Sequence, residues 1–452
     1  MFRVDEIIKA TDGKLIQGQP GDKLKGISTD SRKLNPGDVF LALRGKNFDG
    51  HNFIPAVLKS GTACVIAQKI TGFTLPKGVV FIQVRDTTLA LGDLARFQRQ
   101  KFNKPVIAVT GSNGKTTTKE MIAWVLSGKA KVLKNAGTQN NQIGLPQTLI
   151  QLKESYDFAV VEIGTNHFGE VDYLAKIAGP NIGLITNIGQ SHLEFLKDLK
   201  GVFKEKTALL RNLTKPALAL LNADDKLLKA IIMRQNKGMH VFSYGIKEKS
   251  DFSASAIRSE NQQVRFKVNR KFDFILSTSG GFNVYNALAA IAVGRLLGRA
   301  YSELASRLEN FKFPSGRLRF VQFRGVRFID DTYNSNPLSL SCALETLGSL
   351  NCKGKRILVM GDMRELGSQK ESLHRQIAGS ITNSCDLLVT VGDLARLTAV
   401  AARKRGWASK NIFCCASAAE ARDLLFKKIV PGADDLVLVK GSRSMRMEEV
   451  LK

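Results

Sequence analysis

The sequence predicts an α/β protein of three consecutive domains, and three observations indicate this fold class. Short apolar runs of strand length alternate with helical patterns along most of the chain, as expected for mostly parallel sheets with short crossovers. The period of the apolar residues switches to two between Phe252 and Thr278. The alternation of strands and helices resumes after Pro314, and 452 residues suffice for two to four domains of about 100–200 residues each.

The first predicted domain comprises residues 1–84 and is a small α/β module. Glycines and prolines divide it into short β-like runs, and it contains no phosphate-binding loop. These runs cover residues 38–43, 63–67 and 79–84.

The second predicted domain, residues 85–313, is a mostly parallel sheet with helices. It opens with an apolar run at residues 106–109, a short polar loop and a helical stretch at residues 115–126. Further apolar runs end at Glu162, Asn187 and Asn222, with helical patterns between them. The alternating segment 252–278 predicts an antiparallel meander at the edge of this sheet. Two more helices are expected at residues 283–297 and 301–308.

The third predicted domain, residues 314–452, repeats the alternation of apolar runs and helical segments. This pattern predicts a second, Rossmann-like doubly wound unit. Its strand-like runs cover residues 327–329, 357–360, 387–391, 412–414 and 436–439.

The composition is that of an ordinary globular protein. Hydrophobic residues make up 44% and charged residues 24% of the chain, so a sizeable core is expected. No stretch approaches the roughly 20 uncharged apolar residues of a membrane span, and residues 1–10 lack the apolar run of a signal peptide. Six cysteines without C-x-x-C spacing indicate neither a disulfide framework nor a zinc site. We therefore expect a cytoplasmic protein.

The net charge of +27 is the one unusual feature of the composition. A field of this sign attracts phosphates, nucleic acid or anionic lipid. The lysines and arginines are scattered, however, and no block of five or six like charges occurs. We therefore expect a solvated basic surface on a monomer that has no nucleic-acid partner.

A phosphate-binding loop is the sharpest functional signal. It lies between the strand at residues 106–109 and the following helix, and its glycines let successive N–H groups point at phosphate oxygens. The positive end of the helix adds to this attraction. Lys115 is expected to reach the terminal phosphates of a nucleoside triphosphate, and the Thr116 hydroxyl to bind Mg²⁺. The loop, shorter than G-x-x-x-x-G-K-T, comprises Gly111, Ser112, Asn113, Gly114, Lys115, Thr116 and Thr117.

Carboxylates at strand ends are candidates to complete this metal site. Glu162 ends the apolar run at residues 158–161, where doubly wound sheets place ligand groups. Asp330 and Asp331 also follow an apolar run, but they lie in the third predicted domain. Glu162 is therefore the better metal candidate, and the two aspartates are expected to meet the nucleotide from the far side of a cleft.

Short motifs occur along the whole chain: T-G-S-N-G-K-T-T, V-E-I-G-T-N-H, T-N-I-G-Q-S-H, S-T-D-S-R, P-G-D-V-F-L-A-L-R-G, F-D-G-H, N-N-Q-I-G-L-P, D-D-T-Y-N-S-N-P, G-D-M-R-E-L-G and V-K-G-S-R. Together they resemble the Mur ligases, ATP-dependent enzymes that extend the peptide of the UDP-linked peptidoglycan precursor. The resemblance covers essentially the whole chain, and the D-N-P-R signature of the ligase that adds diaminopimelate is absent.

The resemblance implies a reaction and its substrates. The closest motifs imply an amide-bond ligase of cell-wall synthesis that adds D-alanyl-D-alanine to UDP-N-acetylmuramoyl-tripeptide through an acyl phosphate, releasing ADP and phosphate. It implies ATP and Mg²⁺ as cofactors. Residues implied to contact the substrates are Thr29, Asp30, Ser31, Arg32, Gly50, His51, Asn140, Asn141, Asn334, Ser335, Asn336, Lys440 and Arg443.

The resemblance also implies roles in nucleotide and metal binding. Asn286, Arg317 and Asp331 would contact the nucleotide, and His192 a second metal ion, whereas Phe282 replaces a histidine usual in the family.

Lys206 corresponds to a lysine that the family carbamylates, with Lys204 as its rival. Forming the neutral amine at pH 7 costs an unperturbed lysine about 4.6 kcal/mol, which burial and nearby cations must offset.

Three other functions compete with this interpretation. A sibling or folylpolyglutamate synthase-like ligase would use another amine, although S-T-D-S-R and F-D-G-H argue against it. A P-loop ATPase acting on nucleic acid would show steeply salt-dependent binding. A non-catalytic nucleotide-binding protein would not need an intact Lys115, Thr116 and Glu162.

Overall fold

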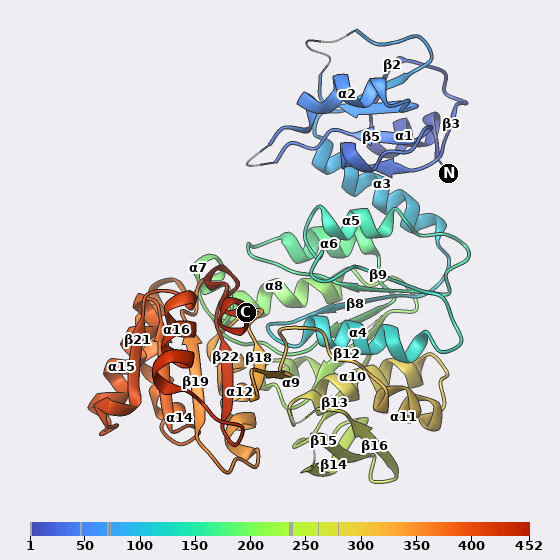
Figure 1. Cartoon of the computed structure of the whole chain (residues 1–452). Helices are drawn as coiled ribbons and strands as arrows, with labels where there is room; N and C mark the ends of the chain where they lie inside the picture. The colour runs from blue at the N-terminus through green and yellow to red at the C-terminus, as the bar shows by residue number, and fades with distance from the viewer. Residues whose placement is uncertain are drawn as a thin grey trace.

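The computed structural model describes residues 2–45, 48–69, 72, 74–234, 238–260, 262–278 and 280–452. Within them the chain forms three α/β units in sequence order, built on sheets of five, nine and six strands, with a separate pair β1–β3 (Figure 1). The predicted fold class is confirmed. No helix in this described part of the chain is long and apolar enough to cross a membrane.

The N-terminal unit is a five-stranded sheet in the order β2-β7-β6-β5-β4. Only β2 runs antiparallel to its neighbour. The predicted runs correspond to β5, β6 and β7. Its elements are β1 (Phe2–Arg3), α1 (Val4–Thr11), β2 (Lys14–Gln17), β3 (Lys23–Leu24), β4 (Ile27–Ser28), β5 (Val39–Leu41), α2 (Ile54–Lys59), β6 (Cys64–Ala67) and β7 (Val80–Gln83).

Helix α3 (Thr87–Lys101) joins the N-terminal and central units. Asp86 caps it by accepting hydrogen bonds from the backbone N–H groups of Thr88 and Leu89. Leu91 near its start packs in the N-terminal core, whereas Ala95 belongs to the core of the central unit. The two units are therefore connected through a helix buried in both.

The central unit is a nine-stranded sheet in the order β16-β15-β14-β13-β12-β11-β8-β10-β9. The strands from β9 to β14 are parallel, and β14, β15 and β16 form the predicted antiparallel meander at one edge. The strands are β8 (Val106–Thr110), β9 (Val132–Lys134), β10 (Phe158–Glu162), β11 (Ile182–Ile185), β12 (Leu218–Asn222), β13 (His240–Gly245), β14 (Phe252–Glu260), β15 (Gln263–Val268) and β16 (Phe272–Leu276).

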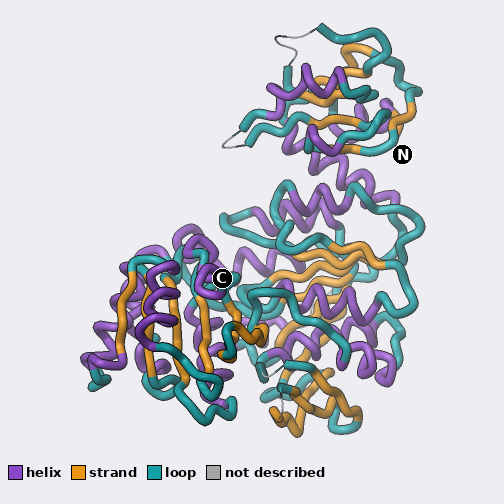
Figure 2. Tube along the Cα trace, in the orientation of Figure 1, coloured by secondary structure: helices purple, strands orange, loops and turns teal. Residues whose placement is uncertain are grey.

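Helices cover both faces of the central sheet (Figure 2). One face packs against α4 and α10, and α10 is buried along most of its length. The other face packs against α3, α5, α6 and α8. Besides α3, the helices are α4 (Lys115–Leu126), α5 (Gly144–Leu149), α6 (Glu170–Ala178), α7 (Leu193–Leu196), α8 (Leu199–Arg211), α9 (Lys226–Ile232), α10 (Asn283–Leu296) and α11 (Tyr301–Glu309).

The C-terminal unit is a doubly wound sheet in the order β17-β18-β22-β19-β20-β21, in which only β17 is antiparallel. The five predicted strands are present and β17 is additional. Its elements are β17 (Arg319–Phe323), β18 (Val326–Asp331), α12 (Pro337–Ser349), β19 (Arg356–Gly361), α13 (Lys370–Gln376), α14 (Ala378–Ile381), β20 (Leu387–Val391), α15 (Asp393–Lys404), β21 (Ile412–Cys415), α16 (Ala418–Leu424) and β22 (Leu436–Lys440).

Candidate active site

A cleft of about 1360 Å³ lies between the central and C-terminal units. Its central side is formed by residues that follow the carboxyl ends of β8, β10, β11 and β12, which is where open α/β sheets bind ligands. The ends of β18 and β22 and the start of α12 face it from the C-terminal unit. Among the predicted site residues, the cleft lining includes Ser112, Asn113, Gly114, Lys115, Thr116, Thr117, Asn140, Asn141, Glu162, His192, Asn286, Arg317, Asp331, Asn334, Ser335, Asn336 and Lys440.

The phosphate-binding loop requires its glycines. Gly111 has a φ of 142°, and a Cβ there would lie 1.9 Å from the Thr186 hydroxyl oxygen. Gly114 has a φ of 79°, and a Cβ there would lie 2.5 Å from Asn286 Oδ1. Gly111 is therefore needed for close packing against the loop after β11, and Gly114 for the entry into α4.

Lys115, the first residue of α4, folds back over the loop. Its amine donates hydrogen bonds to the carbonyls of Gly111 (2.9 Å) and Ser112 (3.2 Å). Burial lowers the pKa of this amine, the charge of Glu162 opposes that effect, and Arg317 adds to it. The lysine thus stands inside the loop, within a concave cradle that suits phosphate oxygens.

Thr116 and Glu162 form a compact pair of oxygen donors beside the loop. The Thr116 hydroxyl lies 2.7 Å from Glu162 Oε2 and accepts a hydrogen bond from Arg317 Nη2 (2.9 Å). The second carboxylate oxygen of Glu162 accepts from Asn140 Nδ2 (2.7 Å). A hydroxyl and one carboxylate fit Mg²⁺, which uses few protein oxygens and completes its shell with phosphates and water. The described residues contain no cluster of three or more His, Cys, Asp or Glu side chains able to hold a metal ion.

Two buried residues that the sequence analysis missed support Glu162. The Asn135 side chain accepts from the Glu162 backbone N–H (2.9 Å) and donates to the Glu162 carbonyl (3.2 Å). The Lys119 side chain, 0% exposed, donates to the carbonyls of Asn135 (2.6 Å) and Gly137 (3.0 Å). Lys119 therefore attaches the loop at Asn135 and Gly137 to helix α4, and this loop in turn holds the backbone of Glu162. The only sequence signal was a lysine one turn before the apolar residues Ile122 and Ala123 of the same helix.

Lys206 lies on α8 and is 1% exposed, whereas Lys204 is exposed. Burial lowers the pKa of the Lys206 amine well below its usual value, and the charge of Lys115 adds to the effect while Glu205 and Glu162 oppose it. Within the described ranges, no hydrogen bond engages this amine. The site therefore favours the neutral amine that carbamate formation requires.

We expect this buried amine to make stability depend on pH. Between its lowered pKa and the unfolded value near 10.4, the unfolded chain binds one more proton than the folded chain, so the free energy of unfolding rises with pH by up to about 1.4 kcal/mol per unit. Lys206→Met should remove this slope. Urea unfolding in CO₂-free buffer between about pH 7 and pH 9, followed by Trp124 fluorescence in a Trp407→Phe background, measures it. Parallel profiles for the two proteins would contradict it.

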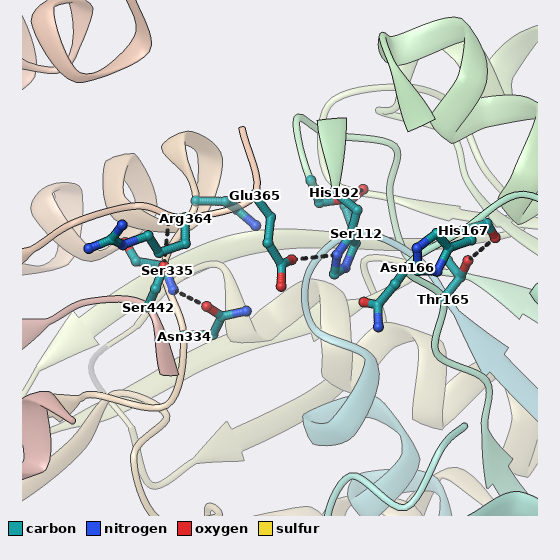
Figure 3. A network of polar contacts seen from close by, with 12 residues as sticks. Ser112, Thr165, Asn166, His167, His192, Asn334, Ser335, Arg364, Glu365 and Ser442 are labelled. Atoms are coloured by element: carbon teal, nitrogen blue, oxygen red, sulfur yellow. Dashed lines mark hydrogen bonds and ion pairs between the residues drawn. The ribbon is translucent and has the colours of Figure 1, made fainter. Parts of the chain in front are cut away.

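His192 faces the C-terminal unit from the start of α7. Its Nδ1 lies 2.7 Å from Glu365 Oε2, which comes from the loop after β19 (Figure 3). Burial lowers the pKa of His192, and Lys115 and Lys206 act in the same direction while Glu365 opposes them. The imidazole is therefore favoured in its neutral form, as a metal ligand must be.

The C-terminal side of the cleft is held by a buried ion pair. Lys440 Nζ lies 2.5 Å from Asp331 Oδ2 and also donates to the Asn334 carbonyl (2.9 Å). Burial raises the pKa of Asp331, and Lys440 and Arg317 oppose this effect. Asn336 caps α12 and donates to Asn113 Oδ1 of the phosphate loop (2.7 Å). The C-terminal unit thus already contacts the loop directly.

The far end of the cleft is lined by aromatic and amide groups. Asn286 donates to Asn283 Oδ1 (2.9 Å) and accepts from the Thr118 hydroxyl (3.0 Å). Phe282 and Tyr285 line the same end, and the Tyr285 hydroxyl donates to Asp224 Oδ2 (2.6 Å). A planar base fits between such rings and amides.

The predicted residues of the N-terminal unit lie outside this cleft. Thr29 accepts a hydrogen bond from Gln147 of α5 (2.5 Å), which brings its loop to the central unit. His51 is held between Asp49 (Nδ1, 2.6 Å) and the Gln68 backbone N–H (Nε2, 3.0 Å). The remaining members are Asp30 and Arg32, paired at 2.9 Å, Ser31, which begins a 3₁₀ turn, and Gly50, where a Cβ would lie 2.6 Å from the Leu43 carbonyl oxygen.

Gly111, Lys206 and Arg443 also lie outside the cleft lining, and Asn141 is occupied locally. Arg443 pairs with Glu448 at 2.8 Å and is largely exposed, so it does not join Lys440 in the cleft. Asn141 lines the cleft, but its side chain accepts from the backbone N–H groups of Ile143 and Gly144 at the start of α5.

Comparison with known proteins gives consistent matches along the chain. Residues 23–99 match the Mur ligase family catalytic domain, residues 109–294 the Mur ligase middle domain, and residues 316–443 the Mur ligase glutamate ligase domain. The UDP-N-acetylmuramoyl-tripeptide–D-alanyl-D-alanine ligases of Bacillus subtilis and Escherichia coli are each 34% identical over 95% of this chain and 93% of theirs.

Solved structures agree with these matches. MurF from Acinetobacter baumannii superposes with a TM-score of 0.90 at 32% identity, covering 99% of this chain and 97% of that one. MurF from Thermotoga maritima, solved in complex with ADP, superposes with a TM-score of 0.83 at 28% identity over 94% of this chain and 96% of that one. The chain therefore belongs to the Mur ligase family.

Proposed function

We propose that this protein is an ATP-dependent ligase of peptidoglycan synthesis that joins UDP-N-acetylmuramoyl-tripeptide to D-alanyl-D-alanine. One observation carries the proposal above the others. A phosphate loop with its lysine and its Thr116–Glu162 pair faces the buried Asp331–Lys440 pair across one cleft, in a chain that aligns over 95% of its length with ligases named for this reaction.

The chemistry follows from the weakness of a carboxylate as an electrophile. Transfer of the γ-phosphoryl group of ATP to a carboxylate oxygen of the tripeptide gives an acyl phosphate and ADP. The amine of D-alanyl-D-alanine then attacks the acyl carbon, and the tetrahedral intermediate expels phosphate as the amide forms and the amine loses a proton. Such transfers are accelerated mainly by positioning and by neutralising charge.

The cations that line the cleft suit this task. Lys115 is placed to contact the terminal phosphates, and Arg317, whose guanidinium lies over the Tyr333 ring at 4.2 Å, to approach them from the segment before β17. Asp331 and Asn336 reach the nucleotide from the C-terminal unit. Docking of that unit also excludes water, which protects an acyl phosphate from hydrolysis.

Mg²⁺ would be held by Thr116 and Glu162, where it would neutralise charge on the phosphates during transfer. A second ion would be held by His192 and by a carbamate on Lys206. Carbamylation joins the neutral amine of Lys206 to CO₂ with loss of one proton, turning a buried cation into an oxygen ligand. The unpartnered amine and its lowered pKa support this assignment.

The substrate and nucleotide ends of the site are assigned to different units. We place the base of the nucleotide near Asn286, without carrying over a role for the family histidine that Phe282 replaces. The UDP end of the acceptor is assigned to the first predicted domain, residues 1–84, through Thr29, Asp30, Ser31, Arg32, Gly50 and His51. The Thr29–Gln147 contact supports a continuous path from that domain, across 85–313, to the domain 314–452.

Phosphate release tests the reaction directly. With ATP and Mg²⁺, release should require both UDP-N-acetylmuramoyl-tripeptide and D-alanyl-D-alanine, and the product should be heavier by the dipeptide less water. Release with glutamate or another amine in place of the dipeptide would indicate a sibling ligase. Release stimulated by RNA or DNA, and by neither co-substrate, would reject the proposal.

A further inference from the structure

The loop after β19 docks the C-terminal unit onto the central unit beside His192. The Glu365 carbonyl accepts a hydrogen bond from the Glu194 backbone N–H (3.2 Å). Gly367, with a φ of 57°, lies so close that a Cβ would stand 3.0 Å from Glu194 Cα. The Glu365 carboxylate completes this contact at 2.7 Å from His192 Nδ1. Backbone and side chain therefore bring one carboxylate onto one imidazole (Figure 3).

Both residues of this contact have unusual backbone conformations. His192 has a φ of 54° and Glu365 a φ of 62°. Non-glycine residues are uncommon in this left-handed region, and such residues concentrate at functional sites. The side chain of His192 is 18% exposed and that of Glu365 is 45% exposed, and both line the cleft. The pair is thus part of the cleft wall, with the carboxylate on its solvent side.

We propose that Glu365 is a positioning residue that orients His192 for metal binding, so that docking of the C-terminal unit strengthens metal binding in the central unit. The inference rests on the proposed function, in which His192 holds a metal ion. It adds a residue from the other side of the cleft and a link between metal binding and domain docking.

The physical argument concerns the two nitrogens of the imidazole. When Nδ1 donates its proton to a carboxylate, the remaining lone pair is on Nε2, and the ring is fixed in orientation. The nearby anion also makes Nε2 a stronger ligand. Here the carboxylate comes from the other structural unit and lies 2.7 Å from Nδ1, although the two groups do not have hydrogen-bond geometry in this structure. A small rotation of the ring would make the bond, and Nε2 has no partner among the described residues. Without docking, His192 would lose both effects.

The coupling must act in both directions. If docking raises the affinity for the metal ion, the metal ion favours docking by the same factor. Metal and nucleotide in the central unit would then help to close the cleft before reaction. A contact that merely fastened the two units would influence docking and leave metal affinity unchanged.

Metal binding by the full-length protein tests the proposal without using activity. Mn²⁺ binding is measured by loss of the free-ion electron paramagnetic resonance signal, in the presence of a non-hydrolysable ATP analogue. Glu365→Gln keeps a hydrogen-bond acceptor but removes the charge, and Glu365→Ala removes both. We expect one class of Mn²⁺ sites to weaken about 10- to 100-fold, more in the alanine variant. Wild-type affinity in both variants would overturn the role of Glu365.

Two further proteins make the outcomes distinct. Glu371→Gln is the matched control, because Glu371 pairs with Arg375 on the exposed side of α13 and should leave Mn²⁺ affinity unchanged. His192→Ala should weaken the same class of sites as Glu365→Ala. If His192→Ala leaves affinity unchanged, the proposed metal role of His192 fails. If His192→Ala weakens binding and the Glu365 variants do not, only the present inference fails.

Small-angle scattering measures the reciprocal effect. The radius of gyration should fall as Mn²⁺ is added with the ATP analogue, and the midpoint should shift to about 10- to 100-fold higher Mn²⁺ in Glu365→Gln. An unshifted midpoint would contradict the coupling.

Discussion

Lys115→Met is expected to lower kcat by about 10³-fold or more, with folding retained. The methionine keeps the length of the side chain that lies over the Gly111 and Ser112 carbonyls, but it removes the only charge inside the loop. A charge that meets the γ-phosphoryl group in the transition state contributes more there than in the bound substrate, so kcat falls. Steady-state release of phosphate with both co-substrates measures the effect.

A matched variant controls for the change in net charge. Lys153→Met removes an exposed lysine of the same unit, far from the cleft lining, and should leave kcat unchanged. Near-normal turnover by Lys115→Met would remove the phosphate loop from the mechanism. Equal losses of kcat in both variants would mean that the overall electrostatic field of the protein, and no single contact of Lys115, was responsible.

Local patterns predicted much of this fold because the relevant signals lie within a few residues of one another. Helix α4 begins at Lys115 and ends at Leu126, as expected from the glycine-containing turn before it and the apolar spacing within it. The period of two located the meander β14–β16 because its inner face is buried and its outer face is not. In the central and C-terminal units, strands β9, β13 and β17 were not predicted: β9 has three residues, and β13 and β17 are only partly buried.

Contacts distant in sequence were the part that the sequence did not reveal. Glu365 stood in the motif G-D-M-R-E-L-G, yet only the fold brings it to His192, which lies far earlier in the chain. Asn135 and Lys119 stabilise Glu162 through a loop that carried no motif of its own. Arg443, which the family resemblance implied to contact the substrates, pairs with Glu448. The end of a predicted strand indicates where a residue lies in the fold. Which side chain that residue contacts depends on the packing of segments distant in sequence.

Basic side chains gather beside the phosphate loop, where the phosphates of a nucleotide would add negative charge. Lys115, Lys206 and Arg317 gather around Glu162, with Lys440 paired to Asp331 across the cleft. Buried charges of the same sign raise the free-energy cost of burying one another, and a neutral Lys206 lowers this cost. A carbamate on Lys206 would reduce it further, because it replaces one of the cations by an anion beside the other two.

Lys206→Ala is therefore expected to lower kcat by about 10²- to 10³-fold, since an anionic ligand beside the phosphates would be lost. The structure separates this residue from its rival: Lys206 is buried, whereas Lys204 is exposed on the same helix, so Lys204→Ala should retain full activity. Added bicarbonate or chloride should restore part of the activity of Lys206→Ala, because a small anion can enter the space that the side chain leaves.

Labelling with ¹³C-bicarbonate tests the carbamate itself. The wild-type protein should show one carbamate carbon resonance that Lys206→Ala lacks and Lys204→Ala retains. Full activity of Lys206→Ala would exclude any role for this lysine in catalysis. If Lys206→Ala loses the resonance but keeps full activity, the carbamate forms without serving catalysis. This outcome is chemically reasonable because an amine held neutral by burial reacts with CO₂ even when no metal ion binds the product. If Lys206→Ala loses both the carbamate resonance and the activity, and Lys204→Ala keeps both, the metal ligand is assigned to the one buried lysine of α8.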